Sequence, residues 1–293
     1  WMENRNKKIS TFNTCNFFLN IKLVICTAQV FNYLKHAEDY GLTVKNYDKN
    51  FDAVINRSRN VASGMSKGVD FLMKKNKIDV IEGYGKIKSG KKVSVENENG
   101  KITDFQATNI IIATGAKSRA LPNLPQDGKK IIGYREAMTL KKQPKKIIIV
   151  GSGAIGVEFA YFYNAMGSEV TIVEYLDRIV PVEDEEVSKA LEVNFKKNGI
   201  KILTSSELIK ADTKGKTLSA TVKNGGNEII LKADIILSAV GIKSNIENIG
   251  LEDVGIVTDD DKVLIDDFYQ TNIPGYYAIG DITKGQALAH VAS

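Results

Sequence analysis

The fold of this chain is decided by the stretch Lys146-Ile147-Ile148-Ile149-Val150-Gly151-Ser152-Gly153-Ala154-Ile155-Gly156. An apolar run of strand length leads into the glycine pattern G-x-G-x-x-G, and the apolar spacing of a helix follows to about Ala165. In such a pattern Gly151 permits the tight turn, Gly153 lets the backbone approach a pyrophosphate, and Gly156 lets the helix pack closely on the strand. The helix N-terminus then offers free N–H groups to the phosphates. The stretch therefore predicts a βαβ unit that binds a dinucleotide.

The next predicted strand, at Glu169 to Glu174, ends in an acidic residue. Glu174 stands about 20 positions beyond the glycines, where a carboxylate holds the 2′-OH of the adenosine ribose. A carboxylate there would repel a 2′-phosphate, so the sequence favours NAD over NADP, with the nearby Arg178 pointing the other way. The alternative is that the glycines serve only a structural turn.

The rest of the chain also alternates helices and strands, which indicates an α/β fold. Helices are predicted over 28–39, 52–75, 154–165 and 185–197, and strands at 80–85, 93–95, near 105, and at 109–115, 146–150, 169–174, 200–203 and 233–241, with three more strands before the last. A hairpin turn is expected at Asn97-Glu98-Asn99-Gly100. The similar strand endings Ala113-Thr114-Gly115 and Ala239-Val240-Gly241 indicate two related nucleotide-binding folds.

The composition narrows the class of protein. The 293 residues, 43% of them hydrophobic and 26% charged, are enough for about two globular domains. The net charge of +5 lies on scattered lysines, so neither a nucleic acid nor a membrane is expected as a partner. Cys15 and Cys26 suggest neither a disulfide framework nor a metal site, which favours a reducing, cytoplasmic location. Asn20 and Lys22 interrupt the apolar run at 17–30 that would otherwise resemble a targeting signal.

Further stretches share their sequence with one family of proteins. They are Ala28-Gln29-Val30-Phe31, Gly83-Tyr84-Gly85-Lys86, Val173-Glu174-Tyr175-Leu176-Asp177-Arg178-Ile179-Val180-Pro181, Thr271-Asn272-Ile273-Pro274-Gly275-Tyr276-Tyr277-Ala278-Ile279-Gly280-Asp281 and Leu288-Ala289-His290. From about Thr27 to Ser293 the chain resembles the dihydrolipoamide dehydrogenases, a family of flavoprotein disulfide reductases. The resemblance implies two Rossmann-like domains of the FAD/NAD(P)-binding type, with the NAD domain (118–242) inserted in an incomplete FAD domain (27–117 and 243–293). Residues 1–26 are unassigned.

The resemblance also implies which residues contact each cofactor. Those expected to contact FAD are Gly85, Thr114, Gly115, Ala116, Asp281, Ala287, Leu288, Ala289 and His290. Those expected to contact NAD are Gly151, Ser152, Gly153, Ala154, Ile155, Gly156, Val157, Glu158, Glu174, Leu208 and Gly241. Asp281 follows a strand-ending glycine, where its carboxylate oxygens can accept hydrogen bonds from sugar hydroxyls of FAD. A plain turn aspartate, and a bulge at Gly83-Tyr84-Gly85, are the alternatives.

Two parts of the family's pattern are missing from the sequence. The redox disulfide is a C-x4-C pair at the start of a helix, whereas ten residues separate Cys15 from Cys26, so no catalytic residue is assigned. The C-terminal dimerisation domain, with its acid–base pair of His and Glu, is also absent. Since the chain opens at Trp1 and stops at Ser293 directly after a motif, we expect a fragment that is cut at both ends and poorly soluble.

The family's activity is the oxidation of dihydrolipoamide with reduction of NAD through FAD. The resemblance therefore implies a flavoprotein oxidoreductase. Its partners would be the lipoyl domain of a 2-oxoacid dehydrogenase complex and a second copy of the complete enzyme, although turnover by this chain in isolation is not expected. The alternatives are a related disulfide reductase, a soluble transhydrogenase, or a non-catalytic NAD-binding remnant.

Overall fold

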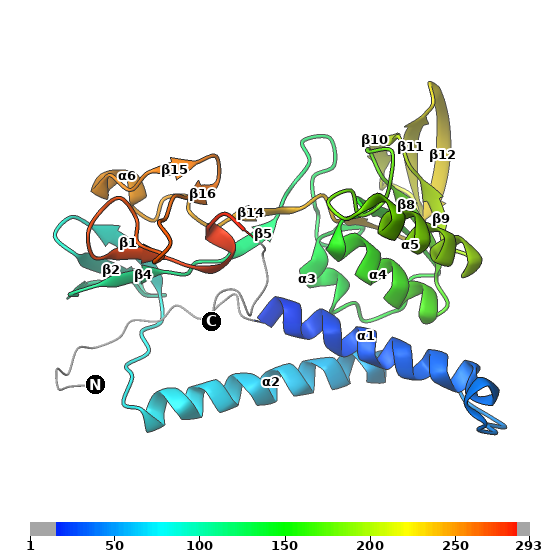
Figure 1. The fold of residues 1–293 in the computed structure, drawn as a ribbon, viewed down its shortest axis with the longest axis horizontal. Coiled ribbons are helices and arrows are strands. Elements are labelled where there is room, and N and C mark those ends of the chain that lie inside the picture. The colour runs from blue at the N-terminus through cyan, green and yellow to red at the C-terminus, as the bar shows by residue number, and fades with distance from the viewer. Residues whose placement is uncertain (1–15, 286–293) are drawn as a thin grey trace. The chain divides into compact units, whose positions relative to one another are not determined.

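The computed structural model describes residues 16–285, with side chains from residue 21 onward (Figure 1). These residues form two compact units. The first unit contains Ala62–Lys117 and the chain from Lys243 onward, and the second contains Leu19–Val61 and Ser118–Ile242. The helices are α1 (Asn16–Lys35), α2 (Phe51–Lys75), α3 (Tyr134–Ala137), α4 (Ala154–Ala165), α5 (Glu185–Lys197) and α6 (Leu251–Val254), with 3-10 turns η1 (Ala37–Tyr40) and η2 (Gly280–Ile282).

The second unit is built around a parallel five-stranded sheet in the order β6-β13-β7-β8-β9. Its strands are β6 (Ile131–Ile132), β7 (Lys146–Val150), β8 (Glu169–Val173), β9 (Lys201–Leu203) and β13 (Ile235–Ser238). The central strand β7 is buried from Ile147 to Val150, which explains its continuous apolar run, because parallel sheets are covered on both faces. Helix α4 connects β7 to β8, so the predicted βαβ unit is confirmed.

An antiparallel sheet of three strands completes the second unit. It consists of β10 (Ser206–Asp212), β11 (Leu218–Asn224) and β12 (Asn227–Ala233). Alternate residues of β11, namely Leu218, Ala220 and Val222, are buried and share one core with Ile148 of β7. These are the three strands that the sequence predicts between β9 and β13.

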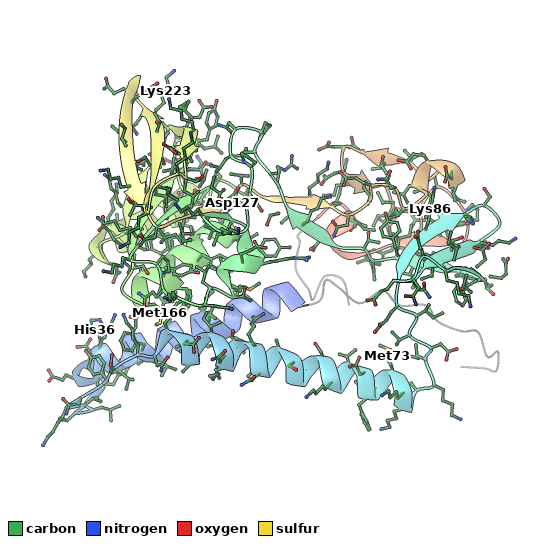
Figure 2. All side chains as sticks on the ribbon, turned by 180° about the vertical axis from the view of Figure 1, so that it is seen from behind. His36, Met73, Lys86, Asp127, Met166 and Lys223 are labelled. Carbon is green, nitrogen blue, oxygen red and sulfur yellow. The ribbon has the colours of Figure 1, made fainter. Side chains whose placement is uncertain are left out.

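Helix α1 and the start of α2 pack on α4. The Phe51 ring lies 6.0 Å from the Phe162 ring, and Asn32 Nδ2 donates a hydrogen bond of 3.1 Å to the Tyr161 hydroxyl. At the C-terminal end of α4, the carbonyl oxygen of Met166, a residue labelled in Figure 2, accepts hydrogen bonds from Gln143 Nε2 (2.6 Å) and from Lys49 Nζ. Residues 19–61 therefore group with the second unit, whereas the family resemblance implies an FAD domain over 27–117; those domain limits stay a prediction.

The first unit contains a meander and a small parallel pair of strands. The meander is β1 (Tyr84–Lys88), β2 (Lys92–Glu96) and β3 (Ile102–Gln106), and the parallel pair is β4 (Ile110–Ile112) with β17 (Tyr276–Ala278). A short pair of β15 (Thr258–Asp259) and β16 (Lys262–Val263) lies in the same unit. Their apolar side chains form one core that includes Ile87, Ile110, Ile112, Leu251, Val263 and Tyr276.

Two local predictions in the first unit have different outcomes. The hairpin turn is confirmed, because Asn97 Oδ1 accepts 3.0 Å hydrogen bonds from the N–H groups of Asn99 and Lys101. The strand expected at 80–85 is wrong in its bounds, because β1 starts only at Tyr84. Gly83 has a φ of +150°, which a regular strand cannot accommodate, and a Cβ there would lie 2.5 Å from the Glu96 carbonyl oxygen.

The stretch Ser118–Ile242 of the second unit is joined to the first unit through β5 (Ala116–Ser118) and β14 (Ile242–Ser244), and these two strands pair with each other. The carboxylate of Glu247 bridges the two segments, with Lys117 Nζ at 2.6 Å and Lys243 Nζ at 2.5 Å. The pKa of Glu247 falls to about 2 because both lysines bind its charged form. Within residues 16–285, no helix combines the length and the apolar character needed to cross a membrane.

Candidate functional site

The three motif glycines have three different surroundings in the turn between β7 and α4. Gly151 has a φ of +93°, and a Cβ there would lie 2.6 Å from the Ala239 carbonyl oxygen. A Cβ at Gly156 would overlap the Gly151 carbonyl oxygen, so this glycine permits the helix to approach the strand. Apart from its two chain neighbours, no atom of the described residues lies within 4 Å of the Cβ position of Gly153, so the fold itself does not require glycine there. The open space at Gly153 fits the backbone approach to a pyrophosphate.

The N-terminus of α4 is suited to an anion. Gly153 is the N-cap residue, no side chain caps the helix, and its first turn contains no acidic residue. The first N–H groups of a helix have no intrahelical partner, and the helix dipole favours negative charge near them. A phosphate at this end would therefore meet unoccupied donors.

Glu174 follows β8 directly and is held in one orientation. The residue is 7% exposed, and its carboxylate accepts three hydrogen bonds. Ser152 donates from its main-chain N (2.7 Å) and from Oγ (2.6 Å) to Oε2, and Leu176 N donates to Oε1 at 2.9 Å. Because β7 and β8 are neighbours, the acidic residue and the glycine turn lie at the same edge of the sheet.

The other residues predicted to contact NAD differ in their location. Ala154, Ile155, Val157 and Glu158 lie in the first turns of α4, and burial raises the pKa of Glu158 while Lys22 opposes this. Gly241 follows β13, a neighbour of β7, and is therefore near the same edge. Leu208 lies in β10 with its side chain 3% exposed in the core. The contact between Leu208 and NAD stays a prediction, as do the others.

Two further buried polar atoms lie near this edge, and one of them belongs to Ser238, which the sequence did not single out. Within residues 16–285, the hydroxyl of Ser238, at the end of β13, and Nε of Arg178, in the loop after β8, are buried without a hydrogen-bond partner. Unpaired buried polar atoms are costly, which makes them natural positions for contact with a bound group. Ser238 directly precedes the Ala239-Val240-Gly241 ending, and that position was the available sequence signal.

In the first unit, residues from the two segments that are expected to bind FAD follow adjacent strands. Thr114 comes after β4 and Asp281 comes after β17, and these strands are parallel neighbours with Ala278 opposite Ile112. Among the described residues, the Thr114 hydroxyl is buried and has no hydrogen-bond partner. Burial raises the pKa of the Asp281 carboxyl, and Lys262 partly offsets the effect. An unpaired hydroxyl and a half-buried carboxyl at one sheet edge fit a ligand that is rich in hydroxyl groups, such as the ribityl chain of FAD.

The remaining residues predicted for FAD are distributed as follows. Gly115 has a φ of +65°, and its carbonyl oxygen accepts a hydrogen bond of 2.8 Å from Asn245 N. Ala116 is buried at the start of β5. Gly85 lies within β1, paired with Val95 of β2. Residues Ala287, Leu288, Ala289 and His290 lie outside the described residues.

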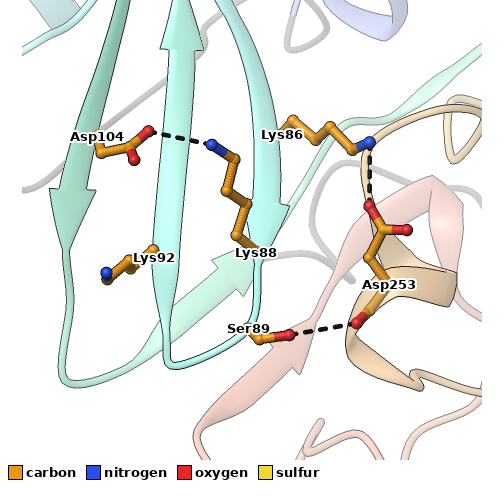
Figure 3. A pocket seen from close by; sticks show the side chains of 6 residues that line it. All are labelled: Lys86, Lys88, Ser89, Lys92, Asp104 and Asp253. Carbon is orange, nitrogen blue, oxygen red and sulfur yellow. Dashed lines mark hydrogen bonds and ion pairs between the residues drawn. The ribbon is translucent and has the colours of Figure 1, made fainter.

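A separate hollow of about 450 Å³ lies in the first unit between the β1–β3 meander and α6 (Figure 3). It is lined by Lys86, Lys88, Ser89, Lys92, Asp104 and Asp253. Lys86 pairs with Asp253 at 3.0 Å and Lys88 pairs with Asp104 at 3.4 Å, with all four side chains about half exposed. Since the charges largely match each other within the hollow, we assign no ligand to it.

Cys26 lies in α1 and is an exposed free thiol. It is the one cysteine among residues 16–285, because Cys15 lies outside them. No residue is assigned to the redox chemistry on this basis.

Comparison with known proteins gives a consistent result. Dihydrolipoyl dehydrogenase of Zymomonas mobilis is 40% identical over 273 residues, which cover 93% of this chain and 59% of that protein. Dihydrolipoyl dehydrogenase of Bacillus subtilis is 38% identical over 283 residues, covering 93% of this chain and 60% of that protein. The chain thus spans about six tenths of the length of these curated relatives.

Solved structures and the family comparison agree with these relatives. LpdA from Mycobacterium tuberculosis superimposes with a TM-score of 0.89 at 25% identity, covering 98% of this chain and 64% of that one. The flavoprotein disulfide reductase RclA from Escherichia coli, at 22% identity and a TM-score of 0.78, shares the fold over 94% of this chain and 58% of its own. Residues 16–293 match the family described as pyridine nucleotide-disulphide oxidoreductase. The chain therefore belongs to the pyridine nucleotide-disulphide oxidoreductase family.

Proposed function

We propose that this chain carries the nucleotide-binding part of a dihydrolipoyl dehydrogenase, which oxidises dihydrolipoamide and reduces NAD by way of FAD. The names of the relatives support this activity, and their greater length makes it a proposal for the complete protein. The observation that carries the proposal is the Glu174 carboxylate, fixed beside the glycine turn by two hydrogen bonds from Ser152.

The residues of the second unit would bind NAD in three ways. The N-terminus of α4 and the open side of Gly153 would receive the pyrophosphate. Glu174 would accept a hydrogen bond from the ribose 2′-OH and repel the 2′-phosphate of NADP. Gly241 and Glu158 would complete the site from the neighbouring strand ending and from α4.

The residues of the first unit would bind FAD at the ends of β4 and β17. Thr114 would provide its buried hydroxyl and Asp281 its carboxyl to the sugar-like chain of the flavin, while Gly85, Gly115 and Ala116 would line the site. When bound, FAD would supply two-electron chemistry between a dithiol and NAD. We propose the domain limits 27–117 and 243–293 for FAD and 118–242 for NAD.

The partners follow from the same proposal. Dihydrolipoamide on the lipoyl domain of a 2-oxoacid dehydrogenase complex would be the substrate, and the complete enzyme would be a homodimer in the cytoplasm. A related disulfide reductase or a soluble transhydrogenase would use the same fold and cofactor sites. Glu174 argues against the enzymes of this family that prefer NADP.

A second candidate function is that of a non-catalytic NAD-binding remnant. The observation that favours it is Cys26, which is exposed and has no second cysteine near it among the described residues. Such a protein would keep the nucleotide site of the second unit and lose the electron transfer.

The test is the visible spectrum of the purified chain after incubation with FAD, before and after anaerobic addition of dihydrolipoamide, together with a fluorescence titration with NADH. Bound flavin that bleaches and saturable NADH binding would support the full activity. NADH binding without flavin would favour the remnant. A chain that binds neither nucleotide would refute both candidates.

A further inference from the structure

We infer that Ser152 is a positioning residue, whose hydroxyl fixes the Glu174 carboxylate and thereby sets the selectivity for NAD over NADP. This inference rests on the proposed NAD site. It concerns the variable position between the first two motif glycines, which the motif itself leaves open.

The hydrogen bonds assign different roles to the two oxygens of Glu174. A carboxylate oxygen has two lone pairs. Oε2 uses both, because Ser152 N donates at 2.7 Å and Ser152 Oγ at 2.6 Å. Oε1 accepts one hydrogen bond, from Leu176 N at 2.9 Å, and keeps one acceptor position. The oxygen available to a ribose hydroxyl is therefore Oε1.

The main chain of Glu174 is fixed by hydrogen bonds on both sides, so any movement of the carboxylate must come from the side chain. Glu174 N donates to the Leu203 carbonyl oxygen at 2.8 Å, and the Glu174 carbonyl oxygen accepts from Ser206 N at 2.9 Å. In the described part of the chain, the serine hydroxyl is the one side-chain group that binds the carboxylate, since the other two donors are main-chain N–H groups. A carboxylate that cannot turn away presents its charge to any 2′-phosphate.

The rest of Ser152 fixes the loop that follows β8 through the main chain. Its carbonyl oxygen accepts a hydrogen bond of 3.0 Å from Val180 N, where a buried β-branched residue has a φ of +40°. This contact does not depend on the hydroxyl. Replacement of Ser152 by alanine therefore removes one hydrogen bond from the carboxylate and preserves both main-chain anchors of the loop.

The experiment measures the dissociation constants of NADH and NADPH for the full chain by fluorescence titration. The wild type should bind NADH at least about tenfold more tightly than NADPH. Ser152→Ala should weaken NADH binding by about five- to tenfold, because a hydrogen bond to a charged group is lost. NADPH binding should change less, so the selectivity falls. Ser152→Thr, which keeps the hydroxyl, should restore it.

A double-mutant cycle separates positioning from a purely structural role. On the Glu174→Gln background, Ser152→Ala should cause little further loss of NADH affinity if the hydroxyl acts through the carboxylate. Additive losses, or an unchanged NADH-to-NADPH ratio in Ser152→Ala, would overturn the inference while the NAD site stands. If Ser152→Ala does not fold, the ratio in Ser152→Thr and Glu174→Gln decides, since equal ratios in both would refute it. A wild type that binds neither nucleotide would instead refute the proposed function on which the inference rests.

Discussion

Lys262 Nζ donates a hydrogen bond of 2.6 Å to the main-chain oxygen of Asp281. The same ammonium donates to Ser244 Oγ at 2.9 Å, and that hydroxyl donates to the same carbonyl oxygen at 3.0 Å. The backbone of Asp281 is thus held from the side of β14 and β16, and these hydrogen bonds do not involve its carboxyl group. The carboxyl is positioned by its neighbours and left available to a ligand.

Replacement of Asp281 by asparagine should change how stability depends on pH. Burial raises the pKa of the carboxyl and Lys262 offsets this only in part, so the folded state binds the proton more tightly than the unfolded state. The free energy of unfolding therefore falls as pH rises from the ordinary value of 3.8 through the raised pKa of the folded state. Asp281→Asn should remove this decrease and be more stable than wild type at neutral pH, while FAD binding is weakened. Urea unfolding between about pH 4 and 7 measures the difference, and parallel curves for both proteins would contradict it.

The contribution of Asp127 to stability should depend on pH in the opposite direction. Burial alone would raise the pKa of Asp127. The N–H groups of Lys129, Ile131 and Lys130, which donate to Oδ1 at 2.7, 3.0 and 2.8 Å, outweigh this effect, so the pKa is lowered. This contribution to stability is present above the ordinary pKa of 3.8 and is lost as pH falls through the folded-state value. Because the side chain is exposed, Asp127→Ala should cost about 1 kcal/mol at pH 7 and less at pH 3. Glu228→Ala on β12 is the control. An equal loss of stability in both variants by urea unfolding would contradict a stabilising role for the Asp127 hydrogen bonds.

The two glycines Gly153 and Gly156 should separate binding from folding. Alanine at 153 meets no atom within 4 Å, so Gly153→Ala should change the free energy of unfolding by less than about 1 kcal/mol while NADH binds at least about tenfold more weakly. Alanine at 156 overlaps the Gly151 carbonyl oxygen, so Gly156→Ala should lower stability by about 1–3 kcal/mol. Denaturant unfolding and NADH titration of both variants give the answer. Full NADH affinity in Gly153→Ala would show that the pyrophosphate does not approach this position.

The buried hydroxyl of Tyr163 should matter for stability. It donates a hydrogen bond of 2.6 Å to the Ala137 carbonyl oxygen, and burial raises the pKa of the phenol. Tyr163→Phe leaves that carbonyl without this donor in a buried place, so it should cost about 1–2 kcal/mol. Tyr161→Phe removes a half-buried hydroxyl that accepts from Asn32 Nδ2 at 3.1 Å, and serves as the matched control with a smaller loss. Similar losses in the two variants would argue against a special role for the buried bond.

The sequence predicts best where local chemistry determines the outcome. The run at 146–150 and the glycine turn specify β7 and the start of α4, because the apolar run, the positive φ of Gly151 and the close approach of Gly156 to Gly151 all lie within a few residues of one another. The carboxylate of Glu174 could be placed at the sheet edge from its position after a strand. Its clamp by Ser152 could not, since a variable motif position carries no pattern.

Long-range packing explains what the sequence could not predict. Helix α1 begins at Asn16 instead of near residue 28, and the segment 19–61 packs on α4 through contacts such as that of Phe51 with Phe162. Amphipathic spacing indicates that a face is buried and does not identify which surface covers it. The start of β1 was missed for a conformational reason, the φ of +150° at Gly83.

The backbone at the two ends of the stretch from Ser118 to Ile242 has an evolutionary and a practical consequence. Arg119 N donates a hydrogen bond of 3.0 Å to the Gly241 carbonyl oxygen, so the two ends of the stretch from Ser118 to Ile242 lie side by side. A segment whose ends lie close together can be gained or lost with little disturbance to the rest of the chain, because only a short connection is then needed. The stretch could also be circularly permuted to begin within a surface loop, provided that other residues cover the apolar face of α4 that packs on Phe51.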